Sequence, residues 1–235
     1  MFMRMPVKLR QPLRALALTV LVTPAAHAQL SGSAGILSNY MYRGITLSAD
    51  KPAARLALNY DAPNGLYAGG QVINGQLAME SHRAAQWIGY AGYAQRLASG
   101  LSWEAGVTHY AFSSTSSWDF SEIYAGLAGE RISARLHYAP NYLGFSERTL
   151  YAEVNGAQPL SERLHFFWHG GYLHSFATAE RSRAEARLGL GAAHQGWQAQ
   201  LSLDLTRLRS DSGNIYTREQ DRVRHEFVLS VARTF

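Results

Sequence analysis

The stretch Trp197-Gln-Ala-Gln-Leu-Ser-Leu-Asp-Leu205 alternates strictly between apolar and polar side chains. Its odd-numbered positions are all apolar, and its even-numbered positions are all polar, Asp204 included. Because successive side chains of a β-strand point to opposite faces, the stretch predicts a strand with one apolar and one polar face. Strands of a soluble β-sandwich and of a membrane barrel both alternate in this way, so this pattern alone leaves both folds open.

Similar alternation recurs along the chain in segments of about ten residues, the length that a tilted strand needs to cross the hydrocarbon layer of a membrane. In the last segment, apolar residues between Val223 and Phe235 share one face, which His225 and Arg233 interrupt. After Gln29 no apolar run is long enough for a transmembrane helix. The pattern predicts strands at residues 34–45, 53–61, 66–74, 85–96, 101–112, 120–128, 131–139, 148–157, 164–175, 183–193, 197–208 and 223–235.

The links between these strands alternate in length. Short turns are expected at residues 62–65, 97–100, 129–130, 158–163 and 194–196, and longer polar links at 75–84, 113–119 and 209–222. This rhythm is typical of a barrel whose turns lie in the periplasm and whose loops face outward. A sheet in lipid must also close, because an open edge would leave backbone groups unsatisfied. We therefore predict an all-β fold, a transmembrane antiparallel up-and-down β-barrel of twelve strands, with ten as the alternative count.

Aromatic residues gather near the ends of the predicted strands. Tyr60, Tyr93, Trp103, Trp197 and Phe235 fall beside short turns, and Tyr42, Trp87, Phe120, Tyr138, Tyr172 and Tyr216 fall near longer loops. Two such groups are expected as the interfacial belts of a membrane barrel. Aromatic residues are also common in strands of every kind, which is the alternative explanation.

The N-terminus has the three parts of a secretory signal. Basic residues between Arg4 and Arg14 precede an apolar stretch at 15–22, and a small-residue cleavage pattern ends at Ala28. The apolar stretch is far shorter than the roughly 18 to 20 residues of a membrane anchor. We expect a cleaved signal peptide at residues 1–28 and a single barrel at residues 29–235, exported through the inner membrane to the outer membrane of a Gram-negative bacterium.

Outside this segment the chain is nearly neutral. Four of the 22 Lys and Arg residues lie within residues 1–28, which leaves 18 bases against 17 acids. The chain therefore lacks the excess of positive charge that binding to nucleic acid requires. It also has no cysteine, which excludes disulfides, thiolate metal sites, thiol nucleophiles and a lipid anchor on a cysteine.

The segment Ser38-Asn-Tyr-Met-Tyr-Arg-Gly-Ile-Thr-Leu-Ser-Ala-Asp-Lys-Pro-Ala53 is followed by Asn59-Tyr60 and Gly65-Leu-Tyr-Ala-Gly-Gly70. These motifs resemble the Gcw_chp family of proteobacterial proteins, which is also called the TorF family of porins. The resemblance implies an outer-membrane location and a pore, and it implies no particular substrate. Leu66 departs from the family pattern, which has an aromatic residue there.

If the apolar face of each strand meets lipid, the polar face lines the lumen. A charged Arg or Lys on the lipid side would cost roughly 2 to 4 kcal/mol at mid-depth, so charges are expected to point inward. The expected pore-lining residues are Arg43, Arg55, Glu104, Glu122, Arg135, Glu153, Glu185, Arg187, Asp204, Arg224 and Glu226. We expect a hydrated channel for passive diffusion of small polar or charged solutes. The alternative is that cross-strand pairs of these charges fill a narrow interior.

No catalytic or phosphate-binding motif occurs, so neither an enzyme activity nor a cofactor is expected. The adjacent pairs Ser81-His82 and His174-Ser175 are poor nucleophile and base candidates, because neighbours in a strand point to opposite faces. His137, His165 and His169 could share the inner face. The last two would lie roughly 13 Å apart, which is too far to share one metal ion.

The expected partners are outer-membrane lipids, lipopolysaccharide, small solutes and the barrel-assembly machinery, which would recognise the C-terminal strand ending at Phe235. Arginines between residues 207 and 224 could bind lipopolysaccharide phosphates, although a solvated loop would have the same composition. The alternative function is therefore a closed barrel that acts through its surface loops, and a lipid-modifying enzyme is a more distant alternative.

Overall fold

The computed structural model describes residues 29–75, 84–114, 116–177, 182–208 and 223–235. The expected signal peptide at 1–28 lies outside these residues. So do the Ser81-His82 pair and the whole of the link at 209–222, which includes Tyr216. Among the described residues, no helix is long and apolar enough to cross a membrane.

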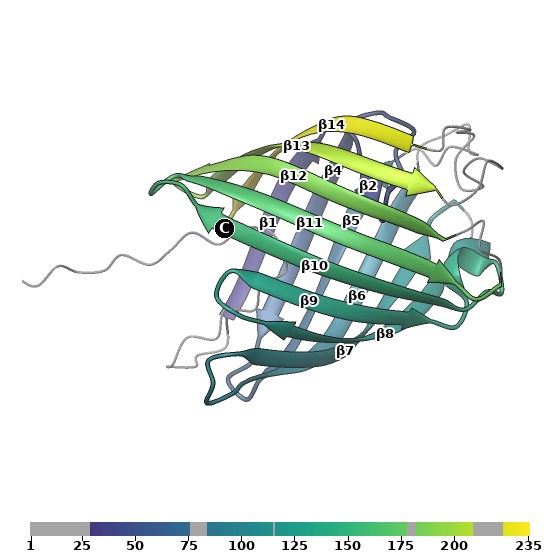
Figure 1. Ribbon diagram of the computed structural model, residues 1–235, viewed down its shortest axis with the longest axis horizontal. Coiled ribbons are helices and arrows are strands. Elements are labelled where there is room, and N and C mark those ends of the chain that lie inside the picture. Colours follow the sequence, from purple (N-terminus) through teal and green to yellow (C-terminus); the bar gives the residue numbers. More distant parts are fainter. Residues whose placement is uncertain (1–28, 76–83, 115, 178–181, 209–222) are drawn as a thin grey trace, which may run out of the picture.

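Strands wind round a single closed barrel, in which each pairs antiparallel with its neighbours (Figure 1). The wall consists of β1 (Gln29–Leu37), β4 (Ala53–Asp61), β5 (Leu66–Gly75), β6 (Ala84–Arg96), β7 (Ser102–Phe112), β8 (Phe120–Ala128), β9 (Ile132–Ala139), β10 (Thr149–Pro159), β11 (Leu164–Ser175), β12 (Arg183–His194), β13 (Trp197–Leu208) and β14 (Val223–Thr234). The prediction of a twelve-stranded up-and-down barrel is confirmed, and the alternative of ten strands is wrong.

The barrel closes where the first strand meets the last. β1 pairs with β14 from Ser33 opposite Thr234 to Leu37 opposite Ser230. Beyond this ladder, the Phe235 amide donates to the Gly32 carbonyl at 3.0 Å, and the Gly32 amide donates to the Phe235 carbonyl at 2.9 Å. A Cβ atom at Gly32 would lie 2.4 Å from the Phe235 ring, so this position favours glycine. Closure satisfies the two edges that an open sheet would expose to lipid.

Large apolar side chains cover the outside of the wall. Leu56 and Leu58 on β4, Ile123 on β8, and Leu188 and Leu190 on β12 are all exposed. On β13 the odd-numbered Trp197 to Leu205 face outward, and the even-numbered Gln198 to Thr206 face inward. A soluble protein would bury so continuous an apolar surface, whereas a lipid bilayer solvates it.

The first predicted strand is wrong in part. The sequence predicts a strand at residues 34–45, but β1 ends at Leu37 and the chain then turns into the barrel. The short strands β2 (Met41–Tyr42) and β3 (Ile45–Thr46) pair only with each other. Part of the segment is therefore extended, as expected, but its two short strands form a small hairpin inside the barrel. We call residues 38–52 the plug.

The expected aromatic belts need two corrections. Trp87, Tyr172, Tyr60, Trp197 and Phe235 are exposed on the outer side, as an interfacial belt requires. Phe120, in contrast, is buried inside the barrel, and Tyr42 belongs to the plug, where its ring meets Tyr110 edge-on at 5.7 Å. Both residues lie at the loop-side end of the barrel. They fill the lumen there, because the apolar residues of the plug pack against the inner face of the wall.

Candidate functional site in the barrel lumen

The eleven residues expected to line the lumen all lie on the inner side of the structure. Arg43 lies at the tip of the plug, and the others lie on wall strands: Arg55 on β4, Glu104 on β7, Glu122 on β8, Arg135 on β9, Glu153 on β10, Glu185 and Arg187 on β12, Asp204 on β13, and Arg224 and Glu226 on β14. Arg43 thus reaches the lumen by a different route from the one expected, because it does not lie on a wall strand.

The plug has a compact structure of its own. Arg43 and Gly44 form the two-residue turn between β2 and β3, with φ values of 46° and 77°. Positive φ at both central positions is what a tight hairpin requires, and Gly44 meets this requirement without strain. The Asn39 amide side chain organises the base, since it accepts from Thr46 and Ser48 hydroxyls at 2.7 and 2.9 Å and donates to Asp50 at 2.8 Å.

The tip of the plug carries a buried ion pair. The Arg43 guanidinium donates to both carboxylate oxygens of Glu122 at 2.8 Å, and the Glu122 side chain has no exposed surface. Glu122 also accepts hydrogen bonds from Tyr110 at 2.9 Å and meets His137 Nδ1 at 2.9 Å. Burial tends to lower the pKa of Arg43, but the Glu122 carboxylate and the neighbouring Tyr42, Tyr110 and Tyr142 hydroxyls together raise it well above its ordinary value, so Arg43 is charged at every relevant pH.

The wall also contacts the backbone of the plug tip. Arg183 on β12 donates from Nε to the Arg43 carbonyl at 2.5 Å and from a terminal nitrogen to the Tyr142 hydroxyl at 2.9 Å. The Arg43 guanidinium lies 4.2 Å from the Tyr151 ring centroid, a cation–π distance. Arg183 and Tyr142 were not expected at this site. Arg183, Glu185 and Arg187 are alternate residues of one strand, so the sequence could have predicted that Arg183 points inward. Nothing in the sequence indicates that Tyr142 folds inward from its loop.

Apolar packing seals the loop side of the lumen around the plug. Ile45 has 0 % and Leu47 has 2 % of its surface exposed. They belong to one cluster with wall residues such as Ile73, Tyr110 and Leu173 and with Tyr142 and Leu143 of the short helix η2 (Tyr142–Gly144). Burial raises the pKa of the Tyr40 and Tyr42 hydroxyls above its ordinary value, so both hydroxyls stay neutral. The loop-side end is therefore a packed core in this conformation.

On the turn side of the plug, the lumen is lined by paired charges. Glu104 accepts from Arg135 Nε at 2.5 Å and from the Tyr67 hydroxyl at 3.0 Å. Arg187 and Asp204 pair at 2.5 Å and lie directly opposite each other on β12 and β13. Five bases and six acids are nearly balanced, so these pairs create a polar inner surface with little net charge.

The remaining charged groups lie near the base of the plug and along the wall. Arg224 bonds both Asp50 on the plug and Glu226 on its own strand. Asp50 was not expected at the site, because sequence reasoning assigned its segment to a link between strands. Arg55 lies on the inner face of β4, close enough to Tyr40 for its charge to act on that hydroxyl.

His137 and His169 contact carboxylates instead of each other. His137 lies between Glu122 and Glu153, with its Nε2 atom 3.6 Å from the Glu153 carboxylate, and His169 Nε2 lies 3.4 Å from Glu185. Within the described ranges, no group of three or more His, Cys, Asp or Glu side chains could hold a metal ion. Ser175 is buried and bonds to Glu147 at 3.4 Å, while the neighbouring His174 ring packs on Phe176. The two side chains of this pair therefore do not form a nucleophile and its base.

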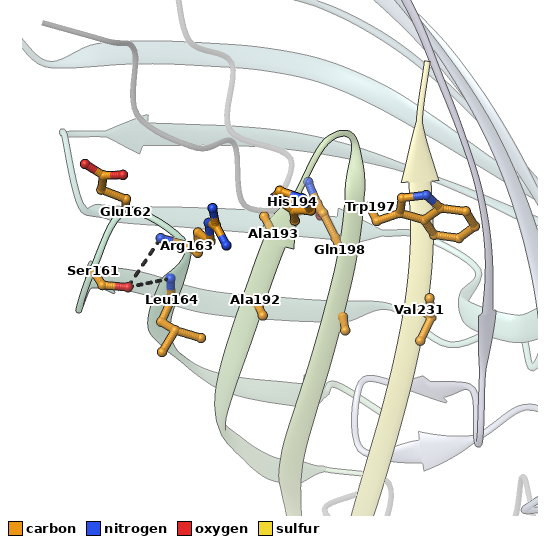
Figure 2. A pocket seen from close by; sticks show the side chains of 11 residues that line it. Ser161, Glu162, Arg163, Leu164, Ala192, Ala193, His194, Trp197, Gln198 and Val231 are labelled. Atoms are coloured by element: carbon orange, nitrogen blue, oxygen red, sulfur yellow. Dashed lines mark hydrogen bonds between the residues drawn. The ribbon is translucent and has the colours of Figure 1, made fainter.

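A separate depression of about 640 Å³ lies at the turn-side rim of the wall. Figure 2 shows its lining, with Leu164 and Ala192 on neighbouring strands, Trp197 and Val231 on the next strands, and the Ser161 to Arg163 turn at one end. The Ser161 hydroxyl accepts from the amides of Arg163 at 3.3 Å and Leu164 at 3.1 Å, which fixes this turn. Leu164, Trp197 and Val231 occupy strand positions whose side chains face outward. The depression therefore lies on the membrane side of the wall and is no part of the lumen.

A family profile matches residues 22–235, nearly the whole chain, and its description reads "Bacterial protein of unknown function (Gcw_chp)". The chain belongs to the Gcw_chp family. No curated protein matches this Gcw_chp chain. The resemblance in the sequence motifs at residues 38–70 is thereby confirmed.

Solved structures resemble this Gcw_chp protein in fold. A structure titled "KdgM porin" has 15% sequence identity and a TM-score of 0.56, and the match covers 87% of this chain and 99% of that one. A second, titled "KdgM porin in complex with disordered oligogalacturonate", has 12% identity and a TM-score of 0.51, and the match covers 89% of this chain and 99% of that one. Together with the apolar outer wall, these likenesses identify the Gcw_chp chain as an outer-membrane β-barrel.

Proposed function

We propose that this protein is a porin-like channel that passes small polar or charged solutes by passive diffusion. The observation that carries the proposal is the lining of the inner wall, where charged pairs such as Glu104 with Arg135 and Arg187 with Asp204 lie below the plug. A barrel with a purely structural interior would be more stable with apolar side chains of similar size, because burying ion pairs costs desolvation energy. The eleven inward charges are proposed to line the solute path. The fold shared with a porin supports this reading.

The second candidate is a closed barrel that acts through its loops. It is favoured by the packing of Ile45 and Leu47, which fill the loop-side lumen. We propose the channel as the first candidate because the wall below the plug is polar and partly exposed, for example at Asn59 and Gln200. Water-accessible polar groups in the turn-side lumen serve solute passage and have no evident role in a permanently closed barrel.

The first prediction concerns conductance. Purified protein of verified fold, inserted in a planar bilayer with KCl, is expected to give discrete conductance steps. The reversal potential in a salt gradient is expected to stay near zero, because the five bases and six acids of the lumen nearly balance. Liposome swelling with small sugars measures uncharged solutes in the same preparation. Protein that is electrically silent and passes no sugar would contradict the channel and favour the closed barrel.

We propose no enzymatic activity for this chain. The similar structures named above are porins, and the Ser175 hydroxyl bonds to Glu147 while the ring of the neighbouring His174 packs on Phe176. Incubation of the pure protein with phospholipid or lipopolysaccharide is expected to give no turnover. A turnover that is lost in Ser175→Ala would overturn this part of the proposal.

We also propose that residues 1–28 direct export and that the last strand is recognised by the barrel-assembly machinery. The second prediction tests the latter point. Deletion of Phe235 is expected to reduce the folded fraction in the outer membrane, because the residue makes two backbone hydrogen bonds to Gly32 at the closing seam. The measurement is the shift in gel mobility between unheated and heated membrane samples. Phe235→Tyr, which keeps the terminal aromatic ring and both backbone hydrogen bonds, is the control, and equal folded fractions in both variants would contradict the proposal.

A further inference from the structure

We propose that the plug, residues 38–52, is a gate, and that the Arg43–Glu122 ion pair is the latch that holds it shut. This inference rests on the proposed channel function and adds to it the element that regulates passage. In the latched state the plug closes the loop-side mouth. In the open state the plug leaves the mouth toward the loop side, while the wall remains intact.

The plug spans the lumen from one side of the wall to the other. On one side, the Tyr40 hydroxyl donates to Gln86 on β6 at 2.6 Å, and Arg43 bonds Glu122 on β8. On the other side, Gly44 lies against Thr206 on β13, where a Cβ atom would be 2.8 Å from the threonine Oγ1. Contacts to opposite walls leave no clear path past a seated plug.

The backbone of the plug pairs mostly within itself, although the Ser38 amide donates to the Leu229 carbonyl of β14 at 2.8 Å and the Arg43 carbonyl accepts from Arg183. β2 and β3 form a two-stranded sheet apart from the barrel, and the Leu47 amide donates to the Tyr40 carbonyl at 2.8 Å within the plug. The plug joins β1 after Leu37 and β4 before Ala53, so both of its connections lie on one side of the barrel. Release therefore breaks none of the strand pairs that close the barrel, which is the requirement for a segment that moves while the wall stays folded.

Side chains hold the plug in place, and the tip carries the most buried polar link. Glu122 is fully buried, and it bonds Arg43, Tyr110 and His137 at the same time. Residues Arg43, Ala49 and Asp50 have φ values of 46°, 50° and 59°, conformations that non-glycine residues seldom adopt. The seated state depends on this polar latch and on the apolar contacts of Ile45 and Leu47.

The chain offers a direct way to lock the plug. It has no cysteine, so an introduced pair has no competing thiol. A Cβ atom at residue 44 would lie 2.8 Å from Thr206 Oγ1, which is close to the Cβ–Sγ separation across a disulfide. Cys at the positive φ of residue 44 also strains the turn, and the single variant Gly44→Cys measures that effect by itself. In the variant Gly44→Cys with Thr206→Cys, oxidation is expected to lower KCl conductance in planar bilayers about tenfold or more, because the seated state becomes the only one populated. Reduction is expected to restore the conductance of the unmodified protein.

A second variant acts on the latch and needs no disulfide. Arg43→Met removes the guanidinium and keeps an unbranched apolar stem, and it is expected to raise the time-averaged conductance about tenfold, since Glu122 then favours the unseated state. The control is Arg131→Met, because Arg131 is exposed in a turn and bonds only Gln158 at 2.9 Å among the described polar contacts. The two single-cysteine variants under the same oxidation are the controls for the lock. Folding of each variant is verified by gel mobility.

The outcomes separate the gate from the channel. Loss of conductance on oxidation, with recovery on reduction, supports the gate. Equal conductance of the oxidised, reduced and unmodified proteins would overturn the gate and leave the channel standing, because solutes would then pass a seated plug. Silence of the unmodified, reduced and Arg43→Met proteins would overturn the channel and the gate together. If Arg43→Met fails to fold, the reversible lock decides the question alone.

Discussion

Glu122→Ala is expected to lower the free energy of unfolding by about 3–5 kcal/mol, because it leaves the buried Arg43 charge without its partner. The substitution also removes the acceptor of the Tyr110 hydroxyl and the partner of His137 Nδ1. Since the Glu122 side chain has 0% exposure, water cannot replace these bonds without a change in the packing of the lumen. The measurement is urea unfolding in lipid vesicles, followed by tryptophan fluorescence.

Glu162→Ala is the matched control, because it removes the same group from an exposed turn. Its effect is expected to stay within about 0.5 kcal/mol. The double variant Arg43→Met with Glu122→Leu removes both charges, and it is expected to lose less stability than the two single variants together. Equal effects of Glu122→Ala and Glu162→Ala would show that the ion pair contributes nothing to the folded barrel.

Leu188→Arg is expected to lower the stability of the barrel by roughly 2 to 4 kcal/mol, because it places a charge on the lipid face near mid-depth. Leu188 lies in the middle of β12, is 47% exposed on the outer side and stands opposite Leu203 of β13. In a soluble sandwich an exposed site would tolerate arginine, so the size of the loss distinguishes lipid from water at this surface. The same unfolding measurement gives the value.

The control for depth is Leu160→Arg. Leu160 is 59% exposed, but it lies in the turn after β10, at the end of the wall. Its substitution is expected to cost about 0 to 1 kcal/mol, as for charges near the interface. Similar losses at both positions would argue against a membrane around the middle of the wall.

The sequence by itself determined the wall of this protein. Period-two alternation is a local property, and it predicted β13 at 197–208 and β4 at 53–61 with the bounds that the structure has. It also predicted the inward direction of charged wall residues such as Glu104, Glu122 and Asp204, because a charge in lipid is costly wherever the strand lies.

Only the tertiary structure decided what fills the barrel. Residues 38–46 include Tyr40, Tyr42, Ile45 and Thr46, residue types that are common in strands, so the sequence could not distinguish a strand of the wall from a hairpin within it. The choice depends on the space enclosed by the closed wall, which exists only after distant strands such as β1 and β14 have paired. The Arg43–Glu122 ion pair could not be predicted for the same reason. Its partners lie 79 residues apart in the sequence and meet only because the plug folds inward.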